Sequence, residues 1–425
     1  MSVTAPVHEP PFTPSGRAAM DEFRALYREI VRRRLATAPP RTRLRAAVTN
    51  AAVPLVAAKA TRRFVRDRSA AVHAAAGVPR WRQAVQFWWV RLRYNVRGPQ
   101  FLDYQMYRPE RRPLAGLYVG DTEHRAIAGF LYRHLEKRGA VARLHDKRTF
   151  DTWCAEHGLP ATPVLAEWED GALVVDRRPE GALPPRDLFS KPADLYHGFG
   201  TARWTYDGED RWLGQDGRAR SEAELVAELA ELSRTLPALG YQVSRRILVM
   251  PRLFNHPALA PITTGTLCTV RIVTYRRPDG PAEFLVGTYK MASGDAPADN
   301  FHYGGIVAPV DPATGRLGQA LRRVERVLVP VERHPDTGAP IAGFQLPFWA
   351  EAVALARRAH DAEPLVPAIG WDVALTPDGP VLLEANFISG ADIMQAPSGR
   401  PLGTTPYVEA LNAHIRAALA ATRGA

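Results

Sequence analysis

The chain has 425 residues, of which 46% are hydrophobic and 23% charged, and it carries a formal net charge of +11. This length supports two or three domains with sizeable cores, and the composition is that of a globular protein rather than of a disordered or fibrous one. The chain contains no run of about 18 apolar residues, which argues against a transmembrane helix.

The first residues and the two cysteines bear on where the protein works. Residues 1–16 are Pro-rich and lack the early Lys or Arg and the apolar core of a secretory signal, so we expect a disordered arm. Cys154 and Cys268 lie far apart and in no metal-ligand spacing. They favour free buried thiols in a reducing compartment, with a disulfide between them as the open alternative. We therefore expect a cytoplasmic protein.

The positive charge belongs to the N-terminal region. Residues 1–113 contain 22 Lys+Arg and 7 Asp+Glu, a surplus of 15, whereas the remaining chain contains 33 against 37. Apolar residues at helical spacing from Met20 to Val31, and within residues 83–94, predict that residues 17–113 are mostly helical. Two interpretations are open. The region contacts acidic lipid headgroups, nucleic acid, a saccharide or another polyanion, or it is an Arg-rich solvated surface over a helical cap.

A mixed pattern of helices and strands follows residue 114. Asp146 is the predicted N-cap of a helix that runs through His157, and Ser221 to Glu224 form a capping box for a helix that ends near Gly240. This pattern predicts an α+β fold of two lobes, each a sheet flanked by helices. The predicted strands cover residues 163–167, 172–175, 187–191, 247–250, 268–275 and 282–290, and the later helices cover 347–359 and 407–420.

Residues 370–386 carry the most informative chemistry. Two apolar runs flank the sequence Thr-Pro-Asp-Gly, and this turn chemistry predicts a β-hairpin. A turn centred on Asp378 places Asp372 opposite Glu384, with Cβ atoms about 5 Å apart. Asn386 lies two residues beyond Glu384 and therefore on the same face. The hairpin thus predicts an Asp/Glu/Asn cluster at one end.

Two carboxylates this close repel each other unless a cation or a shared proton intervenes. Oxygen ligands with one or two carboxylates suit Mg²⁺ that also carries substrate phosphates, so Asp372, Glu384 and Asn386 are candidate metal ligands. The alternative is an ordinary hairpin whose exposed face carries solvated acids. The hairpin alone does not decide between the two.

Further motifs occur in order along the chain, and together they resemble the ATP-grasp ligases over about residues 95–420. The resemblance implies an ATP-grasp fold with a first lobe at residues 114–250 and a second at 251–425. Within the superfamily, the chain is similar to the sugar-transfer-associated group, which is related to α-L-glutamate ligases. The motifs are Asp146-Lys147 with Gly158-Leu159-Pro160, Phe189 to Pro192, His197 to Gly200, Thr269 to Thr274, Asn300 to Gly305, and Asp372 with Glu384-Ala385-Asn386; residues 311–315, 334–338 and 343–349 carry the likeness to the group.

The resemblance implies which residues bind ATP. Lys191 would reach the α- and β-phosphates, and Lys147, in the first turn of its helix, would be a second phosphate contact. Gly198 and Gly200 would let the backbone close over the phosphates, with Arg203 just beyond them.

The purine is expected between the lobes, against Leu248, Val249 and Met250, whose backbone would read its edge. Many relatives place Glu or Gln after this strand for the ribose. This chain has Pro251-Arg252 instead, so the ribose contact has no assigned residue.

Catalytic candidates come from the second lobe. Arg271 and Lys290 are expected at the γ-phosphate and the acyl-phosphate, and Asn300 near the metal cluster. Arg271 has a second interpretation, as a strand arginine paired with an acid such as Glu283. His256 and His302 are loop residues that contact substrate or are only structural.

The activity implied by the resemblance is ATP-dependent amide formation between small-molecule carboxylate and amine substrates. An acyl-phosphate is the intermediate, and Mg²⁺, or Mn²⁺ in its place, is bound by Asp372, Glu384 and Asn386. The substrate would be an amino acid, a peptide or a sugar-linked compound. An ATP-dependent phosphotransferase and a basic scaffold protein with a decayed site are the alternatives. The sequence does not indicate the oligomeric state.

Overall fold

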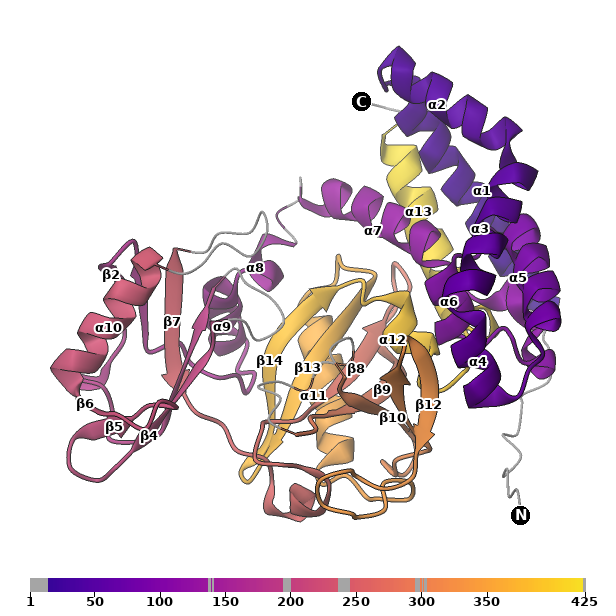
Figure 1. Ribbon diagram of the computed structural model, residues 1–425. Helices are drawn as coiled ribbons and strands as arrows, with labels where there is room; N and C mark the ends of the chain where they lie inside the picture. Colours follow the sequence, from indigo (N-terminus) through magenta and orange to yellow (C-terminus); the bar gives the residue numbers. More distant parts are fainter. Residues whose placement is uncertain are drawn as a thin grey trace.

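The computed structural model of the protein describes residues 14–136, 139, 141–193, 200–235, 245–294, 299, 301 and 304–422. A helical N-terminal region, a large central sheet and a smaller sheet lie side by side (Figure 1). This arrangement confirms the predicted α+β class and the helical N-terminus. In the described residues, no helix is long and apolar enough to cross a membrane.

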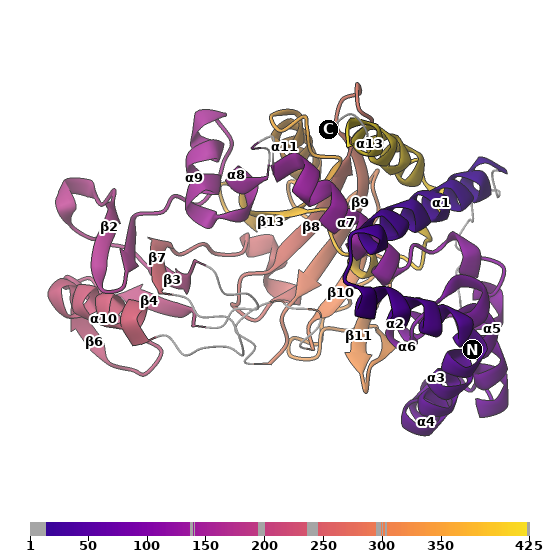
Figure 2. The same ribbon diagram turned by 90° about the horizontal axis from the view of Figure 1, so that it is seen from above.

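The N-terminal region is a helical layer with an aromatic core. The rings of Phe64, Phe87 and Phe101 lie with centroids 4.8 to 5.1 Å apart and join three of its helices. The first helix also packs against the last one of the chain, where Asn412 donates to the Ala19 carbonyl at 2.9 Å (Figure 2). The helices are α1 (Pro14–Ala36), α2 (Pro40–Ala51), α3 (Val53–Asp67), α4 (Ser69–Ala76), α5 (Arg80–Tyr94), α6 (Gly98–Asp103) and α13 (Tyr407–Ala421).

Three helices lead from this layer to the first sheet: α7 (Asp121–Glu136), α8 (Ala142–His145) and α9 (Lys147–Glu156). Asp146 caps α9, because its side chain accepts from the backbone N–H groups of Arg148 and Thr149, and His157 ends the helix. The predicted cap and end of this helix are therefore confirmed.

The first sheet is antiparallel, with the strand order β2-β1-β7-β3-β4-β5-β6. Helix α10 (Glu222–Thr235) packs on it, and the predicted capping box is present: Ser221 N–H donates to Glu224 at 2.9 Å and Glu224 N–H donates to the Ser221 hydroxyl at 3.4 Å. The predicted end near Gly240 lies outside the described residues. The strands are β1 (Ala166–Glu169), β2 (Ala172–Asp176), β3 (Leu188–Pro192), β4 (Ala202–Tyr206), β5 (Arg211–Leu213), β6 (Ala219–Ser221) and β7 (Arg246–Pro251).

The second sheet is also antiparallel, with the order β12-β11-β10-β9-β8-β13-β14. One face packs on α11 (Trp349–Asp361) and α9, where the Trp371 and Trp153 rings stack at 6.4 Å. The other face, including Val273 and Val307, shares its core with the N-terminal helices. The strands are β8 (Thr269–Tyr275), β9 (Glu283–Met291), β10 (Ile306–Val310), β11 (Ala320–Val324), β12 (Val327–Val331), β13 (Ala368–Thr376) and β14 (Gly379–Phe387), and a short helix α12 (Ala391–Gln395) follows.

The β13–β14 hairpin forms as predicted, but by a different turn. Thr376 pairs with Gly379, so the turn has two residues rather than being centred on Asp378. That turn alone would place Asp372 opposite Leu383. A β-bulge between Asp372 and Val373 shifts the register by one residue, and Asp372 faces Glu384 as expected.

The predicted domain boundaries remain predictions. Within them, Phe150, Trp153 and Leu159 pack in the core of the second sheet, and the Leu382 N–H donates to the Pro160 carbonyl at 2.9 Å. The start of the predicted first lobe is therefore attached to the hairpin. Cys154 and Cys268 are buried free thiols, as predicted.

Candidate active site

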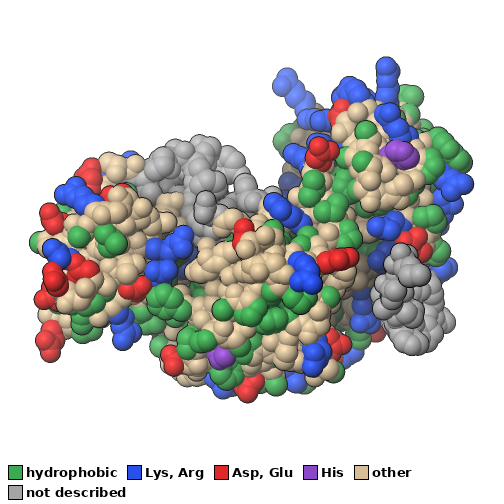
Figure 3. Space-filling model, turned by 60° about the horizontal axis from the view of Figure 1, so that its bottom comes forward, with side chains coloured by type: hydrophobic (Ala, Val, Ile, Leu, Met, Phe, Trp, Pro, Cys, Tyr) green, Lys and Arg blue, Asp and Glu red, His purple; other side chains and the backbone are tan. Residues whose placement is uncertain are grey.

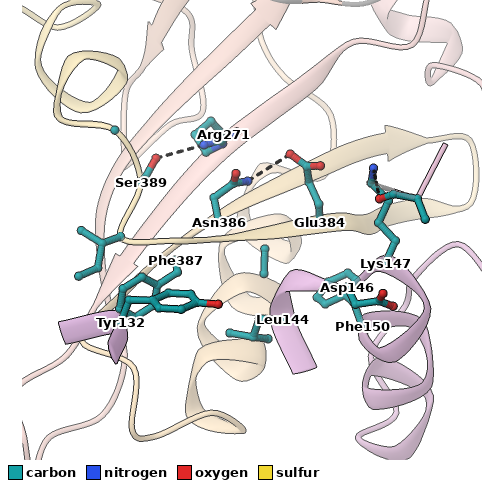
Figure 4. A pocket seen from close by; sticks show the side chains of 14 residues that line it. Tyr132, Leu144, Asp146, Lys147, Phe150, Arg271, Glu384, Asn386, Phe387 and Ser389 are labelled. Atoms are coloured by element: carbon teal, nitrogen blue, oxygen red, sulfur yellow. Dashed lines mark hydrogen bonds between the residues drawn. The ribbon is translucent and has the colours of Figure 1, made fainter. Parts of the chain in front are cut away.

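A cavity of about 460 Å³ lies where α7, α8 and α9 meet the end of β14. One side of it is polar and the other is apolar and aromatic, which suits a ligand that has both a charged and an apolar part. In Figure 4, Glu384, Asn386, Arg271 and Ser389 lie along the upper side, Lys147 lies to the right, and Tyr132, Leu144, Phe150 and Phe387 lie below.

The hairpin contributes Glu384 and Asn386 to the cavity (Figure 4). Asn386 donates its Nδ2 to a Glu384 carboxylate oxygen at 3.2 Å and to the Gly370 carbonyl at 3.4 Å. Burial, and then the negative charge of Asp372, raise the pKa of Glu384. A cation beside Glu384 would offset both effects.

Asp372 faces two cations rather than the cavity. Arg271 binds it with two hydrogen bonds, Nε to Oδ1 at 2.6 Å and an NH2 group to Oδ2 at 2.8 Å, and Lys290 Nζ lies 3.2 Å from Oδ1. Burial disfavours the Asp372 charge, but Arg271 and Lys290 outweigh it and hold its pKa well below the ordinary value. Lys290 also lies 3.6 Å from Asp299, which accepts from the Thr269 N–H and hydroxyl.

Arg271 thus has an acidic partner, but not the predicted one. Glu283 binds Arg277 and Tyr275 instead, whereas Arg271 lies directly opposite Asp372 on the neighbouring strand. The third nitrogen of its guanidinium, Nη1, donates to the Ser389 hydroxyl at 3.1 Å, and Arg271 borders the cavity.

Two backbone features place Ser389 beside Arg271. Ile388 has φ of 43°, a left-handed conformation that is strained for a β-branched residue, and it turns the chain at the end of β14. Gly370 leaves room for the contact, since a Cβ there would lie 2.7 Å from the Ser389 hydroxyl and 3.2 Å from Arg271 Cδ. The strained backbone at Ile388 and the absence of a side chain at Gly370 therefore both allow the hydrogen bond between Arg271 and Ser389.

The two predicted phosphate-binding lysines lie near the hairpin. Lys147 lines the cavity and donates to the carbonyls of Pro192 and Ala193 at 3.3 and 3.0 Å. Lys191 is half-buried in β3, and no described residue forms an ion pair with it. Burial and the charge of Lys147 lower the pKa of Lys191 to about 8, against the opposing effect of Glu384. The structure thus brings Lys191, Lys147 and Glu384 within electrostatic range of one another.

The predicted purine-binding residues lie on a central strand. Leu248 and Val249 each pair with β1 on one side and β3 on the other, so their backbone groups are used within the sheet. The side chains of Leu248 and Met250 lie in a small apolar cluster with Val164 and Ala193. Val249 belongs instead to the core on the opposite face. Of the three, Leu248 and Met250 share a cluster with Ala193, which lines the cavity, and their contact with the purine stays a prediction.

Other predicted contacts are less informative. Gly198, Asn300 and His302 lie outside the described residues, whereas Gly200 is described and has φ of 70°. His256 accepts from the Ala258 N–H at 3.1 Å and caps a short 3₁₀-helix, which is a structural role.

The donor set restricts the kind of metal site that this arrangement supports. Within the residues that the structure describes, no three His, Cys, Asp or Glu side chains are grouped as a metal site. Glu384 and Asn386 supply oxygen donors at the cavity, while Asp372 is bound by Arg271 and Lys290. Such a set fits Mg²⁺ that takes its other ligands from phosphates and water, and it does not fit a site built from protein ligands alone.

Sequence comparison identifies the family. The profile of the sugar-transfer associated ATP-grasp family matches residues 128–409, more than half of the chain. The chain belongs to this family. Membership supports an ATP-dependent ligase in general, and it confirms the resemblance drawn from the motifs. Among curated protein sequences, none matches this ATP-grasp protein significantly.

Solved structures with similarity to this ATP-grasp protein include three ligases or carboxylases. D-alanyl-alanine synthetase A from Vibrio cholerae is 14% identical, with a TM-score of 0.36 over 66% of this chain and 67% of that one. L-amino acid ligase from Bacillus licheniformis is 13% identical, with a TM-score of 0.34 over 64% and 48%. Biotin carboxylase from Campylobacter jejuni is 10% identical, with a TM-score of 0.39 over 73% and 58%. At these values no activity or residue role is transferred.

Several residues of the site were not predicted, among them Ser389, Asp299, Tyr132 and Phe387. Ser389 follows the strained residue Ile388, beyond the end of β14, so the alternation of side chains along the strand does not predict where it points. The sequence contained an indirect signal for Asp299. A lysine buried on a strand, here Lys290, needs an acid nearby, and Asp299 directly precedes the predicted Asn300. Tyr132 and Phe387 come from different parts of the chain and meet edge to face at 5.7 Å.

Proposed function

We propose that this protein is a carboxylate–amine ligase, which uses ATP to form an amide through an acyl-phosphate. The observation that carries the proposal is the cavity itself. It joins two cationic groups, Lys147 and Arg271, and two oxygen donors, Glu384 and Asn386, to an apolar wall. Lys191 and Lys290 lie behind these groups and add positive charge.

In the first step, a carboxylate oxygen of the substrate attacks the γ-phosphorus of ATP in line, the bond to the bridging oxygen breaks, and ADP leaves. Lys147 and Lys191 bind the phosphates and neutralise their charge. Glu384 and Asn386 would hold Mg²⁺, which would supply further charge neutralisation for the phosphates.

Arg271 is the residue proposed to orient the substrate carboxylate. Asp372 fixes its guanidinium plane through two hydrogen bonds, and Ser389 holds the group that borders the cavity. A guanidinium held in this way is suited to a carboxylate and then to the acyl-phosphate. The same charge stabilises the oxyanion that forms when the amine attacks the acyl carbon and phosphate departs.

The apolar wall indicates the kind of acid. Tyr132, Phe150 and Phe387, with Leu144, line the cavity opposite the polar groups. An acid with an apolar or aromatic body would bury it there while its carboxylate meets Arg271.

An isotope experiment tests the proposal. The protein is incubated with ATP, Mg²⁺, pooled amines and carboxylic acids labelled with ¹⁸O in the carboxylate. A ligase transfers one labelled oxygen to inorganic phosphate and leaves the other in the carbonyl group of the amide. A phosphorylated product that keeps the label, without free phosphate, would show a phosphotransferase instead, and unlabelled phosphate would show ATP hydrolysis alone.

Variants link the result to the site. Glu384→Gln is expected to abolish label transfer, and Glu351→Gln, which removes an exposed carboxylate on α11, is expected to leave it unchanged. Equal loss in both variants would contradict the assignment of the cavity as the active site.

A further inference from the structure

Helix α5 packs one face against the other helices and leaves a second, apolar face uncovered. Gln83, Gln86, Phe87 and Val90 are buried against the other helices. On the opposite side, Trp81 is 64% exposed and Val85 58%, followed by Trp88 at 43% and Trp89 at 41%. With about 100° between successive residues, these four side chains and the half-buried Leu92 fall within an arc about 100° wide. We call this arc the α5 stripe.

The α5 stripe collects every exposed tryptophan of the protein. The chain has nine, and the other six are at most 6% exposed. Scattered exposed apolar residues are ordinary, but several large ones in one continuous row usually mark an interaction surface.

Arginines border the stripe on both sides. By the same helical spacing, Arg82 and Arg93 lie along one edge, and Arg80 and Arg91 along the other. The Arg82 guanidinium lies 5.2 Å from the centre of the Trp81 ring, and none of the four arginines forms an ion pair with a described residue. Arg80 and Arg91 donate hydrogen bonds to neutral groups of the helical region, so the charges of all four arginines lack an acidic partner among the described residues. A stripe of Trp and Val between rows of such arginines is the composition of helices that lie in the interface of an anionic membrane.

The surrounding chain is basic over a long distance. Residues 30–102 contain 16 Lys+Arg and one acid, Asp67. Helix α2 repeats the pattern on a smaller scale, because Leu44 and Val48, one turn apart and exposed, lie among Arg41, Arg43 and Arg45. In Figure 3 the helical region, at the upper right, displays Lys and Arg side chains interspersed with hydrophobic ones.

We infer that the α5 stripe docks the protein on the surface of a membrane that contains anionic lipids. Tryptophan and Val85 enter the headgroup and acyl boundary, and the flanking arginines bind lipid phosphates. A nucleic-acid duplex would use the arginines but leave the apolar row in water, and Val85 and Leu92 within the row offer no ring on which the bases of a single strand could stack. The inference does not depend on the reaction that the enzyme catalyses.

Vesicle binding tests this inference with the full chain. Vesicles of phosphatidylcholine alone are compared in sedimentation with vesicles that contain about one-third phosphatidylglycerol. Binding is expected mainly to the anionic vesicles. Because only the three tryptophans of the stripe are exposed, lipids brominated in the acyl chain are expected to quench part of the fluorescence and to shift it to the blue.

Three variants separate the contributions. The triple change Trp81→Ser, Trp88→Ser and Trp89→Ser should lower the partition coefficient at least about tenfold and remove the quenching. Arg82→Gln with Arg93→Gln should remove the preference for anionic lipid. Leu213→Ser, which removes an apolar side chain that is 42% exposed on β5, is the matched control and should bind as the parent does.

Several results would overturn the inference. Unchanged binding of the triple Trp variant would show that the stripe is not the docking surface. A dimer that the triple variant dissociates, without any binding of the parent protein to vesicles, would assign the stripe to a second copy of the chain. Binding to single-stranded DNA but not to vesicles would assign the arginines to nucleic acid.

Discussion

Replacing Lys191 by Met should stabilise the ligand-free protein and abolish ATP binding. The charged ammonium of Lys191 is half-buried in β3, and its pKa is lowered from 10.5 to about 8 by burial and by Lys147. At about 1.4 kcal/mol per pKa unit, this corresponds to about 3.5 kcal/mol by which the folded state disfavours the charge. Methionine is of similar length and carries no charge. We therefore expect the variant to unfold with a free energy up to about 3.5 kcal/mol higher at pH 7.

The stability that the Lys191→Met variant gains over the parent should decrease as the pH rises from 8 to 10.5. Between pH 8 and 10.5 the unfolded chain keeps the Lys191 proton that the folded protein has released, so the stability of the parent rises with pH across this window. The Met variant lacks this contribution. The difference between the two proteins should be largest below pH 8 and disappear above about pH 10.5.

Urea unfolding followed by circular dichroism, at several pH values and with or without ATP, measures both effects. ATP should stabilise the parent and leave the Lys191→Met variant unaffected. Lys59→Met is the matched control, because Lys59 is exposed on α3, and it should change stability by less than about 0.5 kcal/mol at every pH. If Lys191→Met is less stable than the parent at pH 7, or if ATP stabilises both equally, the reasoning is refuted.

Other predictions concern the second lobe. Asp372→Asn leaves Arg271 and Lys290 without their shared acid, so we expect a loss of about 3–5 kcal/mol in urea unfolding; a loss below about 1 kcal/mol would show that the ion pairs are dispensable. Glu384→Gln should retain the stability of the parent, since burial and Asp372 already disfavour the Glu384 charge, and lose turnover. Gly370→Ala should lower kcat and reduce stability by about 1–3 kcal/mol, because the new Cβ would lie 2.7 Å from the Cβ and the hydroxyl of Ser389 and 3.2 Å from the Cδ of Arg271, which Asp372 holds in place; kinetics identical to those of the parent would contradict the proposed role of Arg271.

Short stretches of sequence were sufficient to predict several helices and strands. Turn residues between two apolar runs predicted the β13–β14 hairpin, and the capping residues Asp146 and Ser221 predicted the starts of α9 and α10. These features depend on contacts among residues a few positions apart, so they can be read from a short window. The pairing of Asp372 with Glu384 was predicted correctly, although a β-bulge rather than the turn produces it.

The order of the motifs was enough to predict the family and the general fold, because each short motif has a fixed place along an ATP-grasp chain. The partner of Arg271 was not readable in the same way. It depends on β8 pairing with β13, about a hundred residues later, and this pairing selects Asp372 rather than Glu283. The strained turn at Ile388 that brings Ser389 to Arg271 depends on the same packing.

The sequence by itself determined that an acidic hairpin and a set of lysines exist, and that the N-terminal region is basic and helical. Only the tertiary structure decided which charges neutralise one another and which remain available at the cavity. The physical reason is that an ion pair is set by distance and burial, and both depend on strand pairings between residues far apart in the chain. The same holds for α5, where the sequence indicates a helix with large apolar residues but only the packing of the other helices determines which of them stay exposed.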